Sequence, residues 1–280
     1  MTAGPNTRSG DDGPLTAIVA AMPEELGPLS KRITRRTTWR IGRAHVTSGR
    51  LGRHPVVVAS TGEGEQLARA TTSELLRVLP VRRLLITGVA GAVSLGLHPR
   101  ALVIADQVRR QGQTGDADGE EFRSAPSLVE WAARACGARR GRVITTSAIA
   151  GTVVAKAALD ERFGDQGPAV VDLESAAHAG TAEASGVPWL VLRAVADTAE
   201  ESLPALLEQC RDRDGGIRRF QVAAALLRDP RSLWLLLEMR RRVAECAAVL
   251  ARAVLSLLDA WPVGVEIRTR ARTRTMEEPL

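Results

Sequence analysis

Short apolar runs alternate with longer amphipathic segments over residues 16 to 197. Runs such as Thr16–Ala21, Leu84–Thr87 and Trp189–Arg193 have the length and composition of buried strands. Gln66–Leu79, by contrast, spaces its apolar residues as one face of a helix does. Strands that alternate with helices favour an α/β fold, because each helix covers the sheet and returns the chain to its starting end. The sequence therefore predicts a mainly parallel central sheet covered by helices.

Residues 39 to 59 depart from this alternation. Trp39–Val46 alternates apolar and polar residues, Gly49–Gly52 has the composition of a turn, and Pro55–Ala59 is apolar again. A strand, a turn and a returning strand form an antiparallel hairpin, so we expect a mixed sheet. The other elements expected in this part of the chain are strands over Ala101–Ala105, Arg142–Thr146 and Ala169–Val171, and helices starting at Pro23 and over Leu128–Cys136, Lys156–Phe163 and Glu174–Ser185.

The sequence after Asp197 is helical in pattern. We expect helices over Leu203–Arg211, Ile217–Leu227 and Leu233–Leu258, which make a helical C-terminal extension. In the last of these, apolar residues lie three or four apart and form one stripe, with arginines on the opposite side. Such a helix packs on its own domain or on a second subunit, and a helix lying on a membrane surface is the alternative.

A length of 280 residues is compatible with one large domain or two small ones. Both ends of the chain are polar, and the C-terminal end is rich in arginine. We therefore expect the following organisation: a disordered N-terminus over residues 1–13, a single domain over residues 14–262 that includes the C-terminal helices between residues 202 and 260, and a basic flexible tail over residues 263–280.

Composition argues against several classes of protein. Cys136, Cys210 and Cys246 lie far apart and form no CxxC pair, so we expect neither a disulfide framework nor a metal site. The N-terminus lacks the apolar core of a signal peptide, and no run approaches the roughly 20 uncharged residues of a membrane span. We expect a cytoplasmic protein, placed at the inner face of the membrane if the last helix binds lipid.

Aromatic residues make up only 3% of the chain, which argues against a nucleic-acid surface built on base stacking. We therefore expect no nucleic-acid partner. The net charge of +6 leaves one rival hypothesis, in which the arginine-rich tail binds nucleic acid in a salt-sensitive manner.

Three carboxylates follow apolar runs that are expected to be strands. Glu25 comes shortly after the first run, and Glu174 and Asp197 follow two later ones. In an open α/β sheet, ligands bind at the carboxyl ends of the strands, so these side chains are candidates for one site. Each has an ordinary alternative: Glu25 and Glu174 suit the first turn of a helix, and Asp197 suits a helix N-cap.

Two other features have both a functional and a structural interpretation. Gly88–Gly91 is a run of small residues whose backbone N–H groups can approach a ligand, although a tight turn between a strand and a helix explains it equally well. His178 lies four residues after Glu174. A packed histidine is the favoured interpretation, because no third residue is suitably spaced for a metal site.

Cleavage of a purine N-glycosidic bond would use three carboxyl groups in distinct ways. One must protonate the departing base, which requires a pKa raised by a dry site. A second must activate water, and a third must hold the ribose hydroxyls, where its charge also favours the cationic sugar.

Four segments, in this order, resemble the motifs of the nucleoside phosphorylase superfamily, and among its members those of the methylthioadenosine/S-adenosylhomocysteine nucleosidases. Ala-Ala-Met-Pro-Glu-Glu-Leu ending at Leu26 resembles the first-strand motif, and Thr87–Ala92 resembles the small-residue loop. Val171–Ala177 resembles the ribose-binding motif, and Arg193–Asp197 resembles the motif that protonates the purine. The resemblance implies the phosphorylase/hydrolase-like fold and an enzyme that acts on nucleosides.

The resemblance also implies roles for particular residues. Glu25 corresponds to the base that activates water, and Asp197 to the acid that protonates the purine. Glu174 and Leu173 correspond to ribose-binding residues. The other residues that we expect to contact substrate are Met22, Val89, Ala90, Gly91 and Ile149.

The sequence departs from the motifs of the superfamily at three of these positions. Val89 stands where a serine or threonine is common, which weakens the case for phosphate. Leu173 replaces a methionine, and Ile149 stands in a loop that usually carries an aromatic residue facing the purine. Members of the superfamily need no cofactor, and inorganic phosphate is the alternative co-substrate to water.

A narrower resemblance is to the hopanoid-associated phosphorylases, thought to release adenine from adenosylhopane. It rests on Lys156-Ala-Ala-Leu, on Asp172-Leu-Glu-Ser, and on Leu203-Pro204 at the start of a long helical C-terminus. It implies an adenosyl substrate with a lipid tail, peripheral membrane contact and, as for the whole superfamily, a homo-oligomer. The alternatives are a methylthioadenosine/S-adenosylhomocysteine-type nucleosidase, a purine nucleoside phosphorylase, and a non-catalytic relative that binds nucleoside or lipid.

Overall fold

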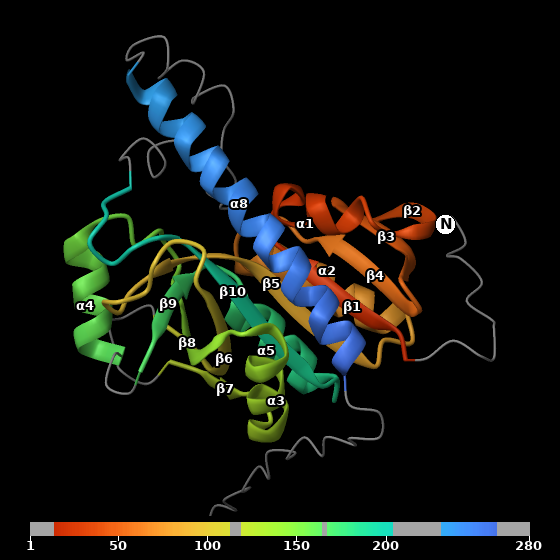
Figure 1. Ribbon diagram of the computed structural model, residues 1–280. Helices are drawn as coiled ribbons and strands as arrows, with labels where there is room; N and C mark the ends of the chain where they lie inside the picture. Colours follow the sequence, from red (N-terminus) through yellow and green to blue (C-terminus); the bar gives the residue numbers. More distant parts are fainter. Residues whose placement is uncertain (1–13, 113–118, 164–166, 204–230, 262–280) are drawn as a thin grey trace, which may run out of the picture.

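The computed structural model describes residues 14–112, 119–163, 167–203 and 231–261. The N-terminus expected to be disordered and the basic tail lie outside the described residues, as do the two helices expected between residues 204 and 230. The rest of the chain forms the expected α/β architecture, a mixed sheet with helices on both faces (Figure 1).

Within the described residues the sheet contains 10 strands and is mainly parallel around its centre. Its main path runs in the order β10-β6-β8-β9-β5-β1-β4-β3-β2, with β7 added to β6. An additional pairing of β10 with β5 closes one part of the sheet into a ring. The strands are β1 (Thr16–Ala20), β2 (Thr34–Ile41), β3 (Ala44–Leu51), β4 (His54–Ser60), β5 (Arg83–Ala92), β6 (Leu102–Arg110), β7 (Glu121–Arg123), β8 (Arg139–Thr145), β9 (Ala169–Asp172) and β10 (Trp189–Asp197).

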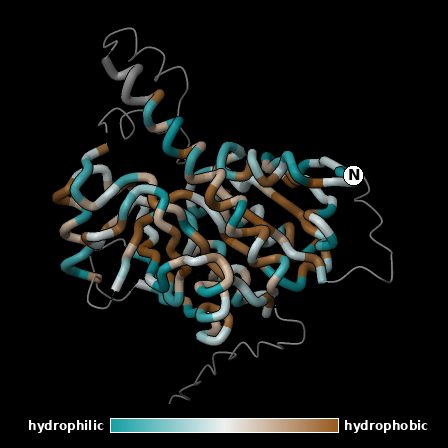
Figure 2. Tube along the Cα trace, viewed as in Figure 1, coloured by the Kyte–Doolittle hydropathy of each residue, from teal (hydrophilic) through white to brown (hydrophobic). Residues whose placement is uncertain are grey.

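Alternate residues of the central strands contribute to two separate hydrophobic cores, because successive side chains of a strand point to opposite faces. On β1, Ile18 packs on the face covered by α1, α3 and α8, and Val19 packs on the face covered by α2 and α5. Figure 2 shows the resulting concentration of apolar residues along the inner strands. The helices are α1 (Pro23–Ser30), α2 (Glu65–Val78), α3 (Pro126–Cys136), α4 (Val153–Phe163), α5 (Ser175–Ala184) and α8 (Arg231–Ala260).

Helix α8 packs on the domain through the apolar stripe expected from the sequence. Residues from Cys246 to Leu258 on this stripe are buried against α1 and α3. Figure 1 shows the N-terminal end of α8 extending beyond the elements beneath it. No helix among the described residues is both long and apolar enough to cross a lipid bilayer.

The first sequence prediction that proved wrong concerns residues 39 to 46. The structure divides this predicted strand into the end of β2 and the start of β3, with a turn at Gly42 and Arg43. Gly42 has φ of 55°, a left-handed conformation that glycine adopts at little cost. The antiparallel return itself is confirmed, because β3 pairs antiparallel with both β2 and β4.

The second correction concerns Gly88–Gly91, which the sequence pattern indicated as a turn. These residues continue β5 and pair with β10, from Arg193 opposite Gly88 to Asp197 opposite Gly91. The small side chains keep the strand open to its neighbours, since a Cβ on Gly91 would lie 3.0 Å from the Asp197 carboxyl. Strand β10 also continues to Asp197, which is therefore the last residue of a strand and not a helix N-cap.

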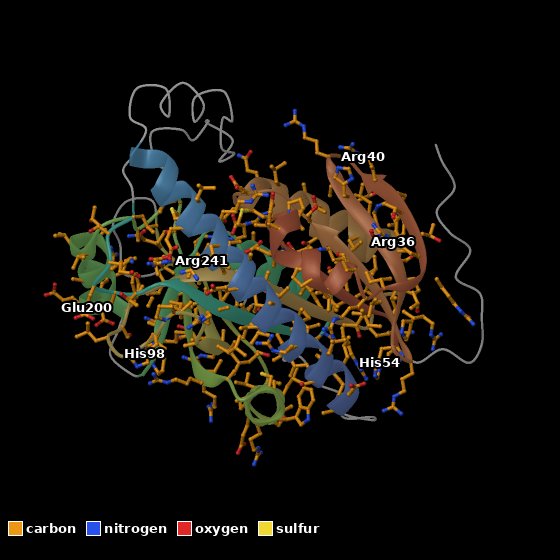
Figure 3. All side chains as sticks on the ribbon, turned by 45° about the horizontal axis from the view of Figure 1, so that its top comes forward. Arg36, Arg40, His54, His98, Glu200 and Arg241 are labelled. Atoms are coloured by element: carbon orange, nitrogen blue, oxygen red, sulfur yellow. The ribbon has the colours of Figure 1, made fainter. Side chains whose placement is uncertain are left out.

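Exposed charged side chains lie on several different elements. Figure 3 shows Arg36 and Arg40 on β2, Arg241 on α8, and Glu200 in the segment after β10.

Candidate active site

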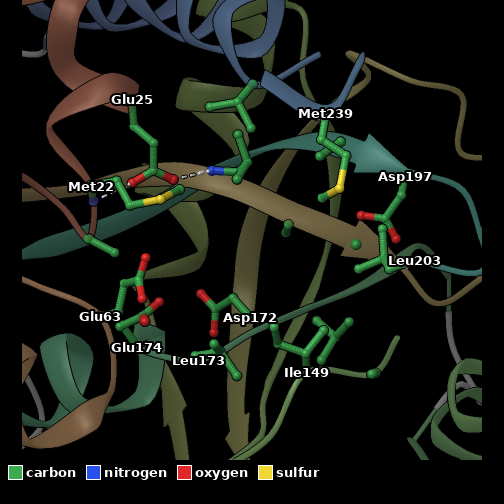
Figure 4. A pocket seen from close by; sticks show the side chains of 18 of the residues that line it. Met22, Glu25, Glu63, Ile149, Asp172, Leu173, Glu174, Asp197, Leu203 and Met239 are labelled. Carbon is green, nitrogen blue, oxygen red and sulfur yellow. Dashed lines mark hydrogen bonds between the residues drawn. The ribbon is translucent and has the colours of Figure 1, made fainter. Parts of the chain in front are cut away.

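A pocket of about 290 Å³ lies where β1, β5 and β10 end, and α8 forms part of its wall. These three strands run parallel, so their carboxyl ends meet at the same edge of the sheet. All nine residues expected from the sequence to bind or act on substrate line this pocket: Met22, Glu25, Val89, Ala90, Gly91, Ile149, Leu173, Glu174 and Asp197. Figure 4 shows Glu25 and Glu174 toward one end of the pocket and Asp197 toward the other.

Glu25 is fixed by two backbone donors from different elements. Its Oε2 accepts a hydrogen bond of 2.8 Å from the N–H of Met22, which caps the first turn of α1. Its Oε1 accepts a hydrogen bond of 2.8 Å from the N–H of Val89 in β5. Burial raises the pKa of the Glu25 carboxyl, while the Arg193 guanidinium and the two N–H donors oppose the rise. Glu25 is thus held as a buried acid whose proton affinity is above the ordinary range.

A buried ion pair between Arg193 and Asp172 lies next to Glu25 and Glu174. Nη2 of Arg193 is 2.5 Å from Oδ2 of Asp172 and donates to Oγ of Ser175 at 2.8 Å. The other Asp172 oxygen accepts from Thr145 Oγ1 at 2.8 Å. The sequence pattern predicts no role for this network, because nothing in it shows that Arg193 points inward.

Glycine is required at position 88 because the network and Glu25 meet there. A Cβ on Gly88 would overlap Nη1 of Arg193 and would lie 2.7 Å from Oε1 of Glu25. The absent side chain therefore allows the guanidinium to lie against β5 beside the Glu25 carboxyl.

Glu174 occupies the N-cap position of α5 and is almost fully buried. Its Oε1 accepts a hydrogen bond of 2.8 Å from the N–H of Gly64, in the segment before α2. Burial raises the pKa of the Glu174 carboxyl to about 8, and the neighbouring Asp172 carboxylate adds to the rise. The free pocket therefore holds Glu174 largely in its protonated form at neutral pH.

Asp197 lies at the end of β10 in contact with the ammonium group of Lys156 from α4. Burial raises the pKa of the Asp197 carboxyl, and the hydrogen bond and charge of Lys156 oppose the rise. A bulge in β10 between Val195 and Asp197 shifts the register at this point, as bulges do where a strand must re-aim a side chain.

His178 is a packed core residue, as its interpretation from the sequence favoured. Its Nδ1 lies 2.7 Å from Oγ1 of Thr72, within the interface of α2 and α5. Burial lowers the pKa of His178 to about 3, so the ring is neutral. Among the described residues, no group of three or more His, Cys, Asp or Glu side chains is arranged to hold a metal ion.

Several pocket residues were not expected from the sequence. They come from segments that the topology brings over the site, most notably the N-terminal half of α8 and the segments after β4 and β10. The additional lining residues with polar or large side chains are Glu63, Thr146, Asp172, Leu203, Met239, Arg240 and Val243.

A model of the Phosphorylase superfamily matches residues 16–255. The chain belongs to this superfamily. The match confirms the family predicted from the four motifs and, together with the relatives below, the prediction of an enzyme. The closer resemblance to the hopanoid-associated group remains a proposal.

Among curated proteins, this superfamily member is similar to the 5'-methylthioadenosine/S-adenosylhomocysteine nucleosidases of Staphylococcus aureus strains JH9 and Newman. Each is 26% identical over 214 residues, which covers 70% of this chain and 93% of that protein.

Solved structures show the same fold. The nucleosidase of Neisseria meningitidis in complex with methylthio-immucillin-A is 21% identical with a TM-score of 0.70, covering 88% of this chain and 99% of that one. The S-adenosylhomocysteine nucleosidase of Streptococcus pyogenes in complex with 5-methylthiotubericidin is 20% identical with a TM-score of 0.71, covering 91% and 100%. At these identities the likeness shows the fold alone.

Proposed function

We propose that this protein cleaves the N-glycosidic bond of an adenosyl compound and releases adenine. The observation that carries the proposal is the convergence of Glu25, Glu174 and Asp197, from three distant parts of the chain, on one pocket. All three carboxyls are buried and have a raised pKa. Perturbed carboxyls gathered in a cleft are typical of acid–base catalysis. The relatives named as nucleosidases support the same reaction.

Each carboxyl has a separate part in the proposed reaction. Asp197 donates a proton to N7 of the purine as the bond between C1' and N9 breaks and the electron pair moves into the base. Glu174 accepts hydrogen bonds from the ribose hydroxyls, which favour its ionised form once substrate is bound, and its negative charge then stabilises the oxocarbenium-like sugar. Glu25 takes the proton of the water that adds to C1'. General acid and base steps of this kind contribute roughly a hundred- to ten-thousand-fold each.

Charge in the pocket favours water over phosphate as the nucleophile. Five carboxyl side chains line the pocket: Glu25, Glu63, Asp172, Glu174 and Asp197. Among the described lining residues, Arg240 is the single arginine or lysine. A phosphate dianion would find one cationic side chain in this lining, whereas each carboxyl that is ionised repels it and attracts a cationic transition state. Val89 also offers no hydroxyl to phosphate, which agrees with hydrolysis.

The substrate that we propose carries an apolar group on the far side of the ribose, namely the polycyclic tail of adenosylhopane. Met22, Leu203, Met239 and Val243 contribute apolar side chains to the pocket, and two of them belong to α8. This wall suits an apolar substituent better than a free hydroxyl. A methylthio substituent, as in the substrates of the named relatives, is the alternative and fits the same chemistry.

One assay separates these candidates. The protein is incubated with adenosine, methylthioadenosine, S-adenosylhomocysteine and an adenosyl lipid, and free adenine is measured in phosphate-free buffer and with added phosphate. We expect adenine release without phosphate, accompanied by a free sugar and not a sugar 1-phosphate. Phosphate-dependent release would instead identify a phosphorylase. Tight binding without any product would identify a non-catalytic relative.

We further propose that the protein acts as a homo-oligomer, in the cytoplasm or at the inner face of the membrane, and without a cofactor. The resemblance to the nucleoside phosphorylase superfamily supports the oligomer, and the resemblance to the hopanoid-associated group supports lipid contact. Light scattering of the purified protein tests the oligomeric state, and co-sedimentation with anionic vesicles tests the contact with lipid.

A further inference from the structure

Lys156 is a fully buried lysine at the edge of the candidate site. Its side chain is 1% exposed and extends from α4 toward the end of β10. It does not line the pocket itself, and the reaction outlined above leaves it without a role. Lysine is almost never fully buried unless it is paired, so its presence here calls for an explanation in terms of its partners.

Three acceptor oxygens surround the Lys156 amino group. Nζ donates to Oδ2 of Asp197, to the backbone oxygen of Thr198 at 2.6 Å, and to the backbone oxygen of Glu201 at 2.8 Å. A lysine ammonium has three N–H donors and no acceptor, so this arrangement satisfies the charged form completely. The site therefore places a positive charge directly behind the carboxyl that faces the purine.

We propose that Lys156 is a positioning residue that strengthens Asp197 as the proton donor to the departing base, an inference that rests on the proposed function. When Asp197 gives its proton to N7, the C1'–N9 electron pair moves into the purine and the carboxyl becomes an anion. The ammonium already contacts Oδ2, so it stabilises the new charge without giving up a proton. Because this interaction grows as the proton leaves, it lowers the barrier and not merely the energy of the bound substrate.

The effect of losing Lys156 on the pKa of Asp197 depends on the other charged groups around the Asp197 carboxyl. Lys156 of α4 and Arg242 of α8 favour the carboxylate, whereas Glu201 of the following segment opposes it. The thiol of Cys246 on α8, which donates to the backbone oxygen of Val195, also interacts electrostatically with Asp197. Lys156 donates a hydrogen bond to the carboxyl, whereas Arg242 acts on it through its charge.

Glu201 offers a matched control, because it shares the structural role of Lys156 without its charge. Its carboxylate accepts from the N–H of Thr198 at 2.9 Å and from Nη1 of Arg242 at 2.9 Å, so it ties the same segment to α8. A substitution there loosens the segment but leaves the ammonium against Asp197.

The test compares Lys156→Met with Glu201→Gln in the full chain. An acid that must be protonated loses activity as pH rises through its pKa. Loss of the Lys156 cation raises that pKa, so the alkaline limb of the kcat profile moves to higher pH while kcat at its optimum falls roughly ten- to a hundred-fold. Glu201→Gln removes an anion, so any movement of its limb is to lower pH. Lys156→Arg, which keeps a cation, should recover part of the rate.

Carbon-13 NMR of the Asp197 carboxyl provides a readout that needs no turnover. The Asp197 signal, assigned by its absence in Asp197→Asn, should titrate at higher pH in Lys156→Met than in the unaltered protein. An unmoved titration in a folded Lys156→Met protein overturns the proposal, as does a rate loss shared equally by Glu201→Gln with no difference in the profiles. If the unaltered protein releases no adenine from any adenosyl compound, the proposed function fails, and the NMR titration still decides the effect of Lys156. If Lys156→Met does not fold, the same titration is made on Lys156→Gln.

Discussion

The backbone N–H of Val89 donates a 2.8 Å hydrogen bond to the carboxyl of Glu25, 64 residues away in the chain. It joins the first turn of α1 to a strand that crosses the middle of the sheet. The contact fixes one oxygen of the carboxyl, and the N–H of Met22 fixes the other. In the proposed reaction, a base held from two sides does not need to be ordered when the substrate arrives, which reduces the cost of the chemical step.

Glu25→Gln should lower kcat roughly a hundred- to ten-thousand-fold, because the amide cannot take a proton from water. Glutamine keeps one acceptor oxygen, so α1 and the fold should be retained. Steady-state kinetics with the preferred adenosyl substrate measures the loss, and circular dichroism checks the fold. Turnover within threefold of the unaltered protein would remove Glu25 from the mechanism.

Asp197→Asn should abolish adenine release while leaving the fold intact. Asparagine cannot protonate the purine, yet it retains an oxygen that can accept from the Lys156 ammonium. The decisive measurement is free adenine by chromatography over a long incubation, with binding of a substrate analogue as the control for an intact pocket. Unchanged release would mean that another group, or water, protonates the base.

Glu174 should make the stability of the empty protein depend on pH. Its pKa is raised from 4.5 to about 8, so the folded state holds this proton more tightly than the unfolded chain does. The contribution to the free energy of unfolding is fully present below about pH 4.5 and is lost as pH rises to about 8. Glu174→Gln has no such proton to lose.

Urea unfolding at pH 5 and pH 8 measures this difference. Between pH 5 and pH 8 the free energy of unfolding of the unaltered protein should fall by on the order of a few kcal/mol more than that of Glu174→Gln. The same variant should lose activity, since the neutral amide does not stabilise a cationic sugar. An equal pH dependence in both proteins would show that Glu174 does not titrate in this range.

Gly88→Ala should destabilise the protein by about 1–3 kcal/mol and lower its activity, because the added methyl group displaces the Arg193 guanidinium and crowds Glu25. Gly27→Ala, in α1, is the matched control. Its Cβ meets nothing within 4 Å. Alanine in a helix is favoured over glycine by about 0.5–1 kcal/mol, so this variant should be neutral or more stable. Thermal unfolding compares the two, and a Gly88→Ala protein as stable as Gly27→Ala would contradict the close packing at β5.

The sequence predicted the architecture and the three carboxyls because both depend on local patterns. Buried strands such as Thr16–Ala20 are short, apolar and bounded by polar residues, so their positions follow from periodicity. The four motifs lie at strand ends, where the topology of a parallel sheet brings them together. The nine residues expected in the site all line one pocket for this reason.

What the sequence could not show depends on contacts between distant segments. Gly88–Gly91 has the composition of a turn, and only its pairing with β10 makes it a strand. Arg193 and Lys156 are charged residues in otherwise apolar surroundings, and their burial is explained by partners on other elements. Met239 and Val243 belong to a helix whose stripe is visible in the sequence, but the pattern does not show that its N-terminal half covers a pocket.

One part of α8 packs on the domain, and another part of the same helix lines the pocket. Its later turns are fixed against α1 and α3, and its earlier ones supply Met239 and Val243 to the pocket. Inserting one residue between these two parts would rotate the earlier part by about 100° without disturbing the anchored part. Evolution can therefore change what this enzyme accommodates beyond the ribose by altering the length of one helix, while the carboxyls on the strands stay where they are.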